Sequence, residues 1–224
     1  MRRNFNMSYS GIIFDVDGTL LDSIQDLADS MNFVLSRHGF PVHAIEKYKQ
    51  FVGNGMRVLA ISALPEEERD EEKVNRYLDE LEKQYEKRWN QATKPYPGIE
   101  ELLRRLEESG IRMFVLSNKP HHFTKEVIDE FFGLKRFELV YGARTGIPKK
   151  PDPYSALEIS KLSGIPVSDF LYLGDSGVDM KTADAAGMYA VGAAWGFRKA
   201  DELWKNGAKA VIQDPLELIE IMKL

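Results

Sequence analysis

Short apolar runs that end at glycine or polar residues recur along the chain and predict buried strands. Gly11–Val16 runs into Asp-Gly, Ile111–Leu116 into Ser-Asn, and Phe170–Leu173 into Gly-Asp. Apolar runs of this length, bounded by turn residues, are typical of strands that are covered on both faces. Three further strands are expected at Glu138–Tyr141, Tyr189–Val191 and Ala210–Ile212.

Apolar residues at helical spacing separate these strands. In Ile99–Ser109 the isoleucine and leucines fall on one helical face, and Gly110 ends the pattern. Strands that alternate with helices predict an α/β fold, with a Rossmann-like parallel sheet covered on both faces. The other helical patterns lie at Thr124–Phe132, Tyr154–Leu162, Asp179–Ala186 and Leu216–Met222.

The segment Asp22–Thr93 breaks this alternation, because it has helical periodicity and no convincing strand. It holds a long charged pattern at Glu66–Trp89, and Pro95–Gly98 marks the return to the strand pattern. We therefore expect an α/β core made of residues 1–21 and 94–224, with residues 22–93 inserted as an all-helical domain. One apolar stripe in this insertion consists of Ile24, Leu27, Ala28, Met31, Val34 and Leu35.

Composition and charge exclude several classes of protein. The 224 residues contain no cysteine, which excludes disulfides, thiolate metal sites and a cysteine nucleophile. The net charge is -5, and lysine and arginine are spread out, so no nucleic-acid partner is expected. No run approaches the roughly 20 apolar residues that span a bilayer, and no apolar signal-peptide region follows Met1 or Met7, either of which could be the start. We expect a cytoplasmic monomer or homodimer with no membrane partner.

Four acidic residues follow predicted strands. Asp15 and Asp17 come after the first strand, and Asp175 and Asp179 come after the run Phe170–Leu173. Open α/β sheets bind ligands outside the carboxyl ends of their strands, so these carboxylates should share one crevice. Crowded carboxylates raise one another's pKa or require a cation. Because there is no histidine or cysteine cluster nearby, the oxygen ligands favour Mg²⁺.

Groups that can bind a phosphoryl group lie at the same edge. Ser117 and Asn118 follow the second strand, and Lys150 precedes Pro-Asp-Pro at the start of a helix. Gly18 lets the backbone N–H groups of the first turn approach a ligand closely. Each feature also has a plain structural interpretation: a strand-ending turn, a helix N-cap and a solvated lysine. The sequence contains neither a Gly-x-x-x-x-Gly-Lys-Ser/Thr motif nor a Gly-x-Gly-x-x-Gly motif, the two glycine-rich loops that bind nucleotide phosphates.

Taken together and in order, these motifs resemble those of the haloacid dehalogenase superfamily. Asp15–Ser23 matches the first motif and Ser117–Asn118 the second. Lys150 with Pro-Asp-Pro matches the third, and Gly174–Ser176 with Asp179 matches the fourth. The resemblance covers nearly the whole chain, and the helical insertion is similar to the helical cap of that family.

The resemblance implies a role for each of these residues. Asp15 would attack phosphorus and form an aspartyl-phosphate, and Asp17 would protonate the leaving group and then help to activate water. Mg²⁺ would be held by the carboxylates of Asp15 and Asp175 and by the backbone carbonyl of Asp17. The remaining roles implied are phosphate binding by Ser117, Asn118 and Lys150, orientation of Asp17 by Thr19, and orientation of metal-bound water or Lys150 by Asp179.

The segments Ser117–Pro120 and Gly53–Gly55 look most like phosphoglycolate phosphatases. In that interpretation Gly53, Asn54 and Gly55 close over the phosphate, and Arg57 pairs with the carboxylate of the substrate. The alternative is an inter-helix turn followed by a surface arginine. The roles of Lys119 and Lys149 stay open, although Lys150 fits the third motif better than Lys149.

The sequence thus predicts a Mg²⁺-dependent phosphatase that hydrolyses a small phosphomonoester through an aspartyl-phosphate, with phosphoglycolate ranked first. The alternatives on this scaffold are a sugar phosphomutase resembling β-phosphoglucomutase, a pyrophosphatase, and a binding protein without activity. A dehalogenase is disfavoured, because those relatives lack the second aspartate, which here is Asp17. The physiological substrate is left open, because in such folds the cap selects the substrate.

Overall fold

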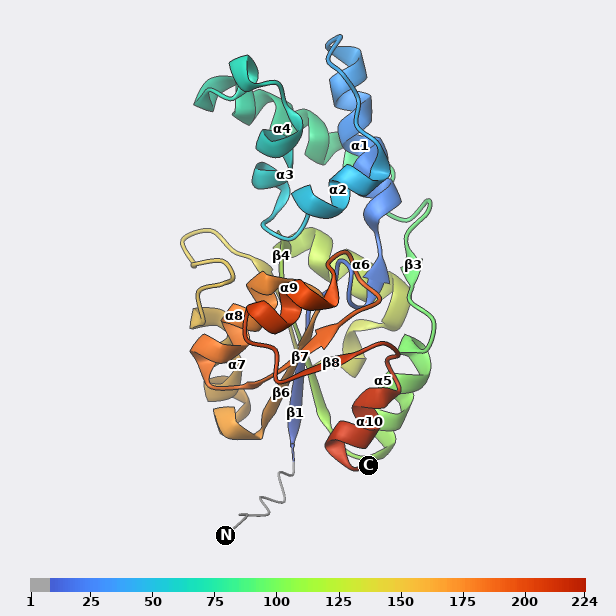
Figure 1. Ribbon diagram of the computed structural model, residues 1–224, viewed down its shortest axis with the longest axis vertical. Coiled ribbons are helices and arrows are strands. Elements are labelled where there is room, and N and C mark those ends of the chain that lie inside the picture. Colours follow the sequence, from blue (N-terminus) through green and yellow to red (C-terminus); the bar gives the residue numbers. More distant parts are fainter. Residues whose placement is uncertain (1–8) are drawn as a thin grey trace.

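The computed structural model describes residues 9–224, so the choice between Met1 and Met7 lies outside the described residues. The chain forms an α/β body with a helical domain at one end, and the C-terminus lies at the opposite end (Figure 1). No helix among residues 9–224 combines the length and the apolar character that crossing a membrane requires.

Within the described residues, six strands form one parallel sheet in the order β5-β4-β1-β6-β7-β8. All of them overlap the apolar runs described above, so the predicted parallel sheet is confirmed. The strands are β1 (Gly11–Phe14), β4 (Arg112–Pro120), β5 (Leu139–Ala143), β6 (Phe170–Gly174), β7 (Tyr189–Ala193) and β8 (Ala210–Ile212).

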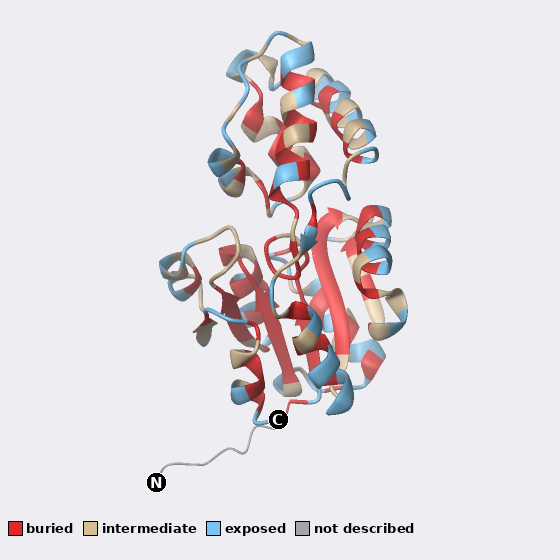
Figure 2. Cartoon of the chain, turned by 90° about the vertical axis from the view of Figure 1, so that its right-hand side faces the viewer, coloured by how far each residue is buried: buried red, intermediate tan, exposed pale blue. Residues whose placement is uncertain are grey.

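Helices cover both faces of the sheet, and each face has its own hydrophobic core. Ile12 and Phe14 of β1 belong to one core, whereas Ile13 belongs to the other, as the alternation of side chains along a strand requires. Figure 2 shows the strands as a buried layer between these helices. The first face is covered by α5 (Ile99–Glu108), α6 (His121–Phe132) and α10 (Glu217–Met222), and the second by α7 (Tyr154–Ser163), α8 (Gly177–Ala186) and α9 (Ala200–Lys205).

The helical domain, called the cap below, has a separate hydrophobic core. Its elements are α1 (Ile24–Arg37), α2 (Ile45–Phe51), α3 (Met56–Ala63), a 3-10 turn at Glu66–Glu68, and α4 (Glu71–Tyr85). The apolar stripe predicted on α1 is buried in this core. Asp70 caps α4 by accepting the backbone N–H of Lys73, so this helix begins at Glu71, inside the long charged pattern Glu66–Trp89.

Two adjacent connections join the cap to the α/β body. Leu21–Asp22 (β2) pairs antiparallel with Lys94–Pro95 (β3). The buried carboxylate of Asp26 accepts hydrogen bonds of 2.7–3.0 Å from the backbone N–H groups of Ala92 and Thr93 and from the Thr93 hydroxyl. Asp26 therefore fixes the returning connection against the first helix of the cap.

Candidate active site

Polar side chains gather where β1, β4 and β6 end. Asp15 follows β1, which lies between β4 and β6, and Asp175 follows β6. The strand order changes direction at β1, and such a point is where open α/β sheets bind ligands. A pocket with an empty volume of about 370 Å³, part of it open to solvent, lies between this edge and the cap. The α/β body lines it with Asp15, Asp17, Ser117, Asn118 and Lys119, and the cap with Leu27, Val52, Gly53, Gly55, Met56 and Leu59.

Lys150 is a buried cation among these groups. Its side chain is 2% exposed, and its ammonium lies 2.8 Å from Asp15 Oδ1 and 2.7 Å from Asp179 Oδ1. It also donates to the carbonyl oxygen of Leu116 at 3.0 Å. These acceptors use all three ammonium protons, so Lys150 is held in one position. Lys149, by contrast, is exposed.

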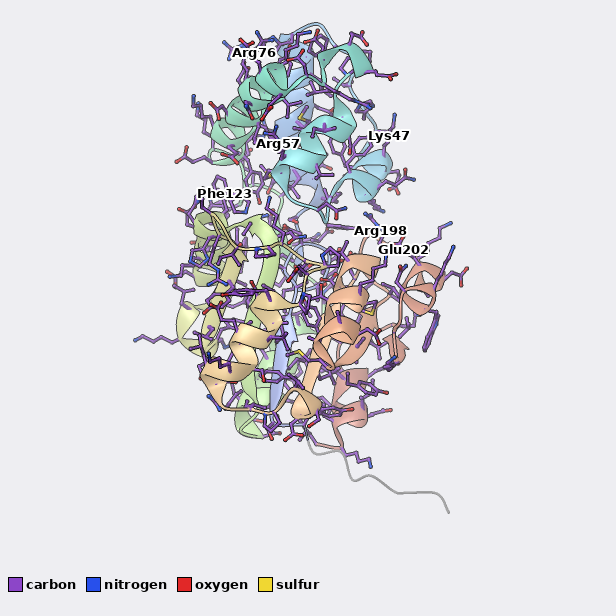
Figure 3. The ribbon with its side chains drawn as sticks, turned by 90° about the vertical axis from the view of Figure 1, so that its left-hand side faces the viewer. Lys47, Arg57, Arg76, Phe123, Arg198 and Glu202 are labelled. Carbon is purple, nitrogen blue, oxygen red and sulfur yellow. The ribbon has the colours of Figure 1, made fainter. Side chains whose placement is uncertain are left out.

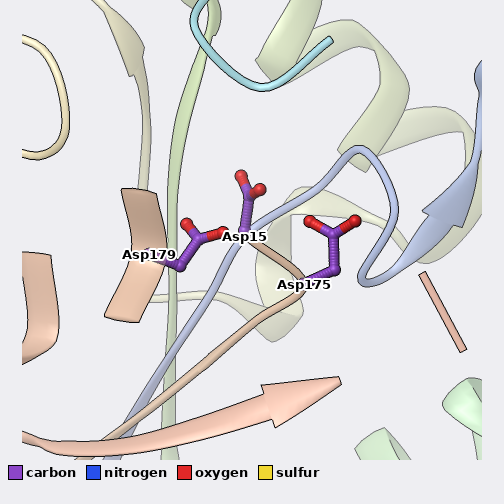
Figure 4. A group of neighbouring side chains, drawn as sticks. All are labelled: Asp15, Asp175 and Asp179. Carbon is purple, nitrogen blue, oxygen red and sulfur yellow. The ribbon is translucent and has the colours of Figure 1, made fainter. Parts of the chain in front are cut away.

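Asp15, Asp175 and Asp179 form a buried acidic cluster, with ligand oxygens that all lie within 4.8 Å of one another (Figure 4). Burial, and then the charge of Asp179, raise the pKa of Asp15 to about 7, even though Lys150 acts in the opposite direction. Burial and the other two acids also raise the pKa of Asp175 well above its usual range. Acids that resist joint ionisation in this way favour a bound cation.

The oxygen atoms of this cluster suit Mg²⁺. Asp179 is committed to the protein, because Oδ1 pairs with Lys150 and Oδ2 accepts from the backbone N–H and hydroxyl of Ser176. Asp15 and Asp175 each keep one carboxylate oxygen that accepts no hydrogen bond from the described residues. Two carboxylates with space for water and phosphate oxygens are a common Mg²⁺ ligand set. The residues present therefore fit the predicted metal, and Asp15 and Asp175 have the oxygen atoms that could bind it.

The carboxylate of Asp17 is held by two side chains. The Lys119 ammonium donates to Oδ1 and Oδ2 at 2.8 and 2.9 Å, and the Ser23 hydroxyl donates to Oδ1 at 2.6 Å. Burial alone would lower the pKa of Lys119, but Asp17 and Tyr85 together outweigh it through charge and hydrogen bonding, and they raise this pKa above its usual range. The hydroxyl of Thr19 is buried without a hydrogen-bond partner among the described residues. The predicted orientation of Asp17 by Thr19 is therefore corrected: Ser23 and Lys119 hold it.

Ser117 and Asn118 differ in what they offer to a ligand. The Ser117 hydroxyl lines the pocket and accepts the backbone N–H of Lys119, which leaves its own proton for a ligand. The Asn118 amide donates to the carbonyl oxygens of Gly53 and Lys150, and its oxygen accepts the N–H of Lys150. This commitment to the protein speaks against the predicted phosphate contact of the Asn118 side chain. Instead, Asn118 ties the Lys150 segment to the cap.

The loop after β7 supports the turn that carries Asp17. Gly18 has φ of 87°, and a Cβ atom there would lie 2.2 Å from Asp175 Oδ2, so only glycine fits. The backbone N–H of Phe197 donates to the same oxygen at 2.7 Å. The indole N–H of Trp195 donates to the carbonyl oxygen of Thr19 at 3.0 Å. Phe197 acts through its backbone, so no pattern of side chains along the sequence could have indicated its contribution.

The cap loop at Gly53–Gly55 lies over the pocket. Gly53 and Gly55 line it, whereas the Asn54 side chain is exposed. Arg198, at the boundary between the cap and the α/β body in Figure 3, donates to the carbonyl oxygen of Val52 at 2.9 Å. This bond fastens the loop to the α/β body.

Arg57 is not among the residues that line this pocket. Its guanidinium donates to the side-chain oxygen of Asn75 on α4, and it lines a wider cleft between the cap and the α/β body. The structure thus brings the predicted glycines to the site and places the Arg57 side chain outside it.

Comparison with known proteins identifies the family. Residues 12–193 match the family of haloacid dehalogenase-like hydrolases. The chain belongs to this family. The resemblance found in its motifs is therefore confirmed, and so is the α/β core that the family implies.

Several relatives of this hydrolase share most of its length. It is 34% identical over 212 residues to a phosphoglycolate phosphatase of Pseudomonas syringae pv. tomato, and the matched region covers 93% of this chain and 78% of that protein. Phosphoglycolate phosphatase 1 of Pseudomonas aeruginosa is 33% identical with the same coverage. The crystal structure of a candidate phosphoglycolate phosphatase from Lactobacillus delbrueckii subsp. bulgaricus superposes with a TM-score of 0.89 at 30% identity, covering 96% of this chain and 99% of that one.

Proposed function

We propose that this hydrolase is a phosphatase that cleaves a small phosphomonoester, with Asp15 as nucleophile, Mg²⁺ as cofactor and phosphoglycolate as its preferred substrate. One observation carries the proposal. Asp15 faces a small pocket, is paired at 2.8 Å with the buried cation Lys150, and belongs to an acidic cluster that favours a metal ion.

Mg²⁺ would be held by the carboxylates of Asp15 and Asp175 and by the backbone carbonyl of Asp17. When bound, it supplies positive charge that neutralises the acids and stabilises the phosphoryl oxygens. The Ser117 hydroxyl would hold the same oxygens from the protein side as charge shifts during transfer, and Lys150 would join it by exchanging its bond to Asp15 for one to a phosphoryl oxygen.

The covalent mechanism has two steps. In the first, the Asp15 carboxylate forms a bond to phosphorus and the bond from phosphorus to the leaving oxygen breaks, while Asp17 gives that oxygen a proton. In the second, water attacks the aspartyl-phosphate and gives its proton to Asp17, which frees Asp15 and inorganic phosphate. The position of Asp17, lining the same pocket as Asp15, supports this division of roles.

The size of the pocket supports a small ester. Its empty volume is about 370 Å³, and apolar side chains of the cap, among them Leu27, Met56 and Leu59, close it opposite the acids. The relatives named above are phosphoglycolate phosphatases of similar sequence along most of their length. Both facts support phosphoglycolate as the substrate. A contact between Arg57 and its carboxylate stays a prediction, and it would require the bond to Asn75 to break.

Initial rates on a panel of phosphate esters, with and without Mg²⁺, test the proposal. The panel contains phosphoglycolate, pyrophosphate, glucose 1-phosphate and p-nitrophenyl phosphate. We expect Mg²⁺-dependent phosphate release, with the highest kcat/KM for phosphoglycolate. Isomerisation of glucose 1-phosphate without phosphate release would favour the mutase instead. Absence of phosphate release from every ester in the presence of Mg²⁺ would contradict a phosphatase.

A further inference from the structure

We propose that Lys119 is a positioning residue that sets the orientation of Asp17 for proton transfer, and that Tyr85 of the cap holds Lys119 in place. The inference rests on the proposed role of Asp17 in the phosphatase reaction. It assigns a function to a lysine that the sequence motifs leave open, and it connects the acid to the position of the cap.

Lys119 and Asp17 form a close ion pair that is shielded from water. The ammonium lies 2.8 and 2.9 Å from the two carboxylate oxygens, and the Lys119 side chain is 1% exposed. Contact with both oxygens fixes the plane of the carboxylate, because rotation of the carboxylate would break one of the two bonds. The Ser23 hydroxyl adds a bond to Oδ1, so Oδ2 has fewer donors and is the freer oxygen for exchanging a proton with a ligand.

An aromatic ring of the cap lies against the ammonium. The Lys119 nitrogen is 4.7 Å from the ring centroid of Tyr85 on α4, within the range of a cation–π contact. Tyr85 is fully buried and packs edge-on against Phe123 of α6, with ring centroids 5.2 Å apart. Tyr85 belongs to the cap, whereas Phe123 belongs to α6 of the α/β body and lies near its boundary with the cap in Figure 3. The contact around Lys119 therefore depends on how the cap is placed.

Lys119 has a rival role, because among the described residues that line the pocket it is the only cation. It could therefore bind the carboxylate of phosphoglycolate directly. The geometry favours positioning, because two of its three protons already face Asp17 and the ring of Tyr85 covers part of the ammonium. The two roles predict different responses to a change of leaving group.

The test compares three substrates in Lys119→Met and the native protein. Phosphoglycolate has an alkyl leaving group with a carboxylate, 2-hydroxyethyl phosphate has an alkyl leaving group without one, and the leaving group of p-nitrophenyl phosphate needs no proton. We expect kcat to fall by about 10–100-fold for both alkyl esters, since misplaced catalytic groups cost on this order. For p-nitrophenyl phosphate we expect a change of less than about threefold, because proton transfer does not assist its departure.

Two outcomes would overturn the role of Lys119. If kcat falls for phosphoglycolate alone, Lys119 is a ligand of the substrate carboxylate. If kcat changes equally for all three esters, or for none of them, Lys119 does not position Asp17. Lys125→Met on α6 is the matched control, because Lys125 is exposed, and it should behave as the native protein. Should Lys119→Met fail to fold, Lys119→Gln, which keeps one donor, is measured on the same three esters, and the same two outcomes would overturn the role.

Asp17→Asn, measured in parallel, separates this inference from the proposed function. If Asp17→Asn itself shows no dependence on the leaving group, the proposed role of Asp17 fails, whatever Lys119 does. Tyr85→Leu tests the cap contact, and we expect the same pattern of losses at up to about 30-fold, the value of a cation–π contact that is shielded from water. Unchanged relative rates in Tyr85→Leu would show that Tyr85 has no part in positioning Lys119.

Discussion

Burial raises the pKa of Asp15 to about 7, and the neighbouring Asp179 adds to the rise. An acid whose pKa is higher in the folded protein holds its proton more tightly when the chain is folded. In the metal-free protein, the stability associated with protonated Asp15 is therefore fully present below the ordinary aspartate pKa of 3.8 and is lost as the pH rises toward 7.

Asp15→Asn should remove this pH dependence. In the presence of EDTA, the melting temperature of the variant should exceed that of the native protein by an amount that grows between pH 5 and pH 8. The growth should be at least about 2–4 °C, which corresponds to roughly 1 kcal/mol in a chain of this size. Thermal unfolding of both proteins at each pH provides the measurement. A constant difference across this range would mean that Asp15 titrates normally.

Residue types and spacing were enough to predict the acids and Lys150, because their chemistry requires these side chains. The support of Asp17 could not be predicted in the same way. The turn after β1 folds back, with Gly18 N–H bonded to the carbonyl oxygen of Leu21, and this brings Ser23 to Asp17. Thr19 is closer to Asp17 in sequence, but the turn leaves its hydroxyl without a partner among the described residues.

At the scale of helices and strands, the connections between the cap and the α/β body depend on Asp26. In the native protein, N–H and O–H donors of Ala92 and Thr93 bind both carboxylate oxygens of Asp26. An asparagine would replace one of these oxygens by an NH₂ group, which cannot accept a hydrogen bond from them. We expect Asp26→Asn to lower the free energy of unfolding by about 1–3 kcal/mol, the usual cost of buried groups left unsatisfied. Urea unfolding would measure it.

Asp29→Asn is the matched control on the same helix. The Asp29 side chain is 38% exposed and lies 3.6 Å from Arg88, so its replacement should change stability by no more than about 0.5 kcal/mol. Equal losses in the two variants would show that Asp26 has no special part in the connection.

The strands and most helices could be predicted because apolar periodicity extends over several residues in each. Three elements were not predicted. The strands β2 and β3 contain two residues each, too few to display a period. The helix α9 buries a single residue, Leu203, so no apolar stripe marks it. The start of α4 at Glu71 depends on the local bond from Lys73 N–H to Asp70, not on the charge pattern that extends to either side.

At the scale of the whole molecule, metal binding should couple the active site to the stability of the protein. At pH 8, Mg²⁺ at 100 times its Kd should stabilise the fold by about 2.7 kcal/mol, and by less at pH 5, where protons compete for Asp15 and Asp175. Thermal unfolding with and without Mg²⁺ measures this effect. EDTA should also stop phosphate release, and added Mg²⁺ should restore it.

Asp175→Asn should lose both the Mg²⁺-dependent rise in melting temperature and the activity. Full activity after thorough chelation would count decisively against a metal-dependent mechanism. If Mg²⁺ raised the melting temperature of Asp175→Asn as much as that of the native protein, the metal would bind outside this cluster.

The division into an α/β body and an inserted helical domain could be inferred from the change of periodicity near Asp22 and Thr93. The placement of the cap could not, because it depends on side chains that meet only in the folded chain. Asn118 binding Gly53, Arg198 binding Val52, and Tyr85 covering Lys119 each join residues far apart in sequence. For that reason the predicted contact of Arg57 was plausible by position, whereas its side chain lies outside the pocket. Cytoplasmic location and a monomeric or homodimeric state stay predictions.

The central claim is that phosphate is transferred to Asp15, and trapping that intermediate tests it most directly. The native protein is quenched in acid during turnover of phosphoglycolate with Mg²⁺. Asp17→Asn is quenched during turnover of p-nitrophenyl phosphate, because its first step then needs no proton while its second step should be slow. Both are digested at low pH and analysed by mass spectrometry. We predict a phosphate on the peptide that contains Asp15, at Asp15 itself, and none in Asp15→Asn, which should also release no phosphate. Phosphate on a different residue, or undiminished turnover by Asp15→Asn, would contradict the account.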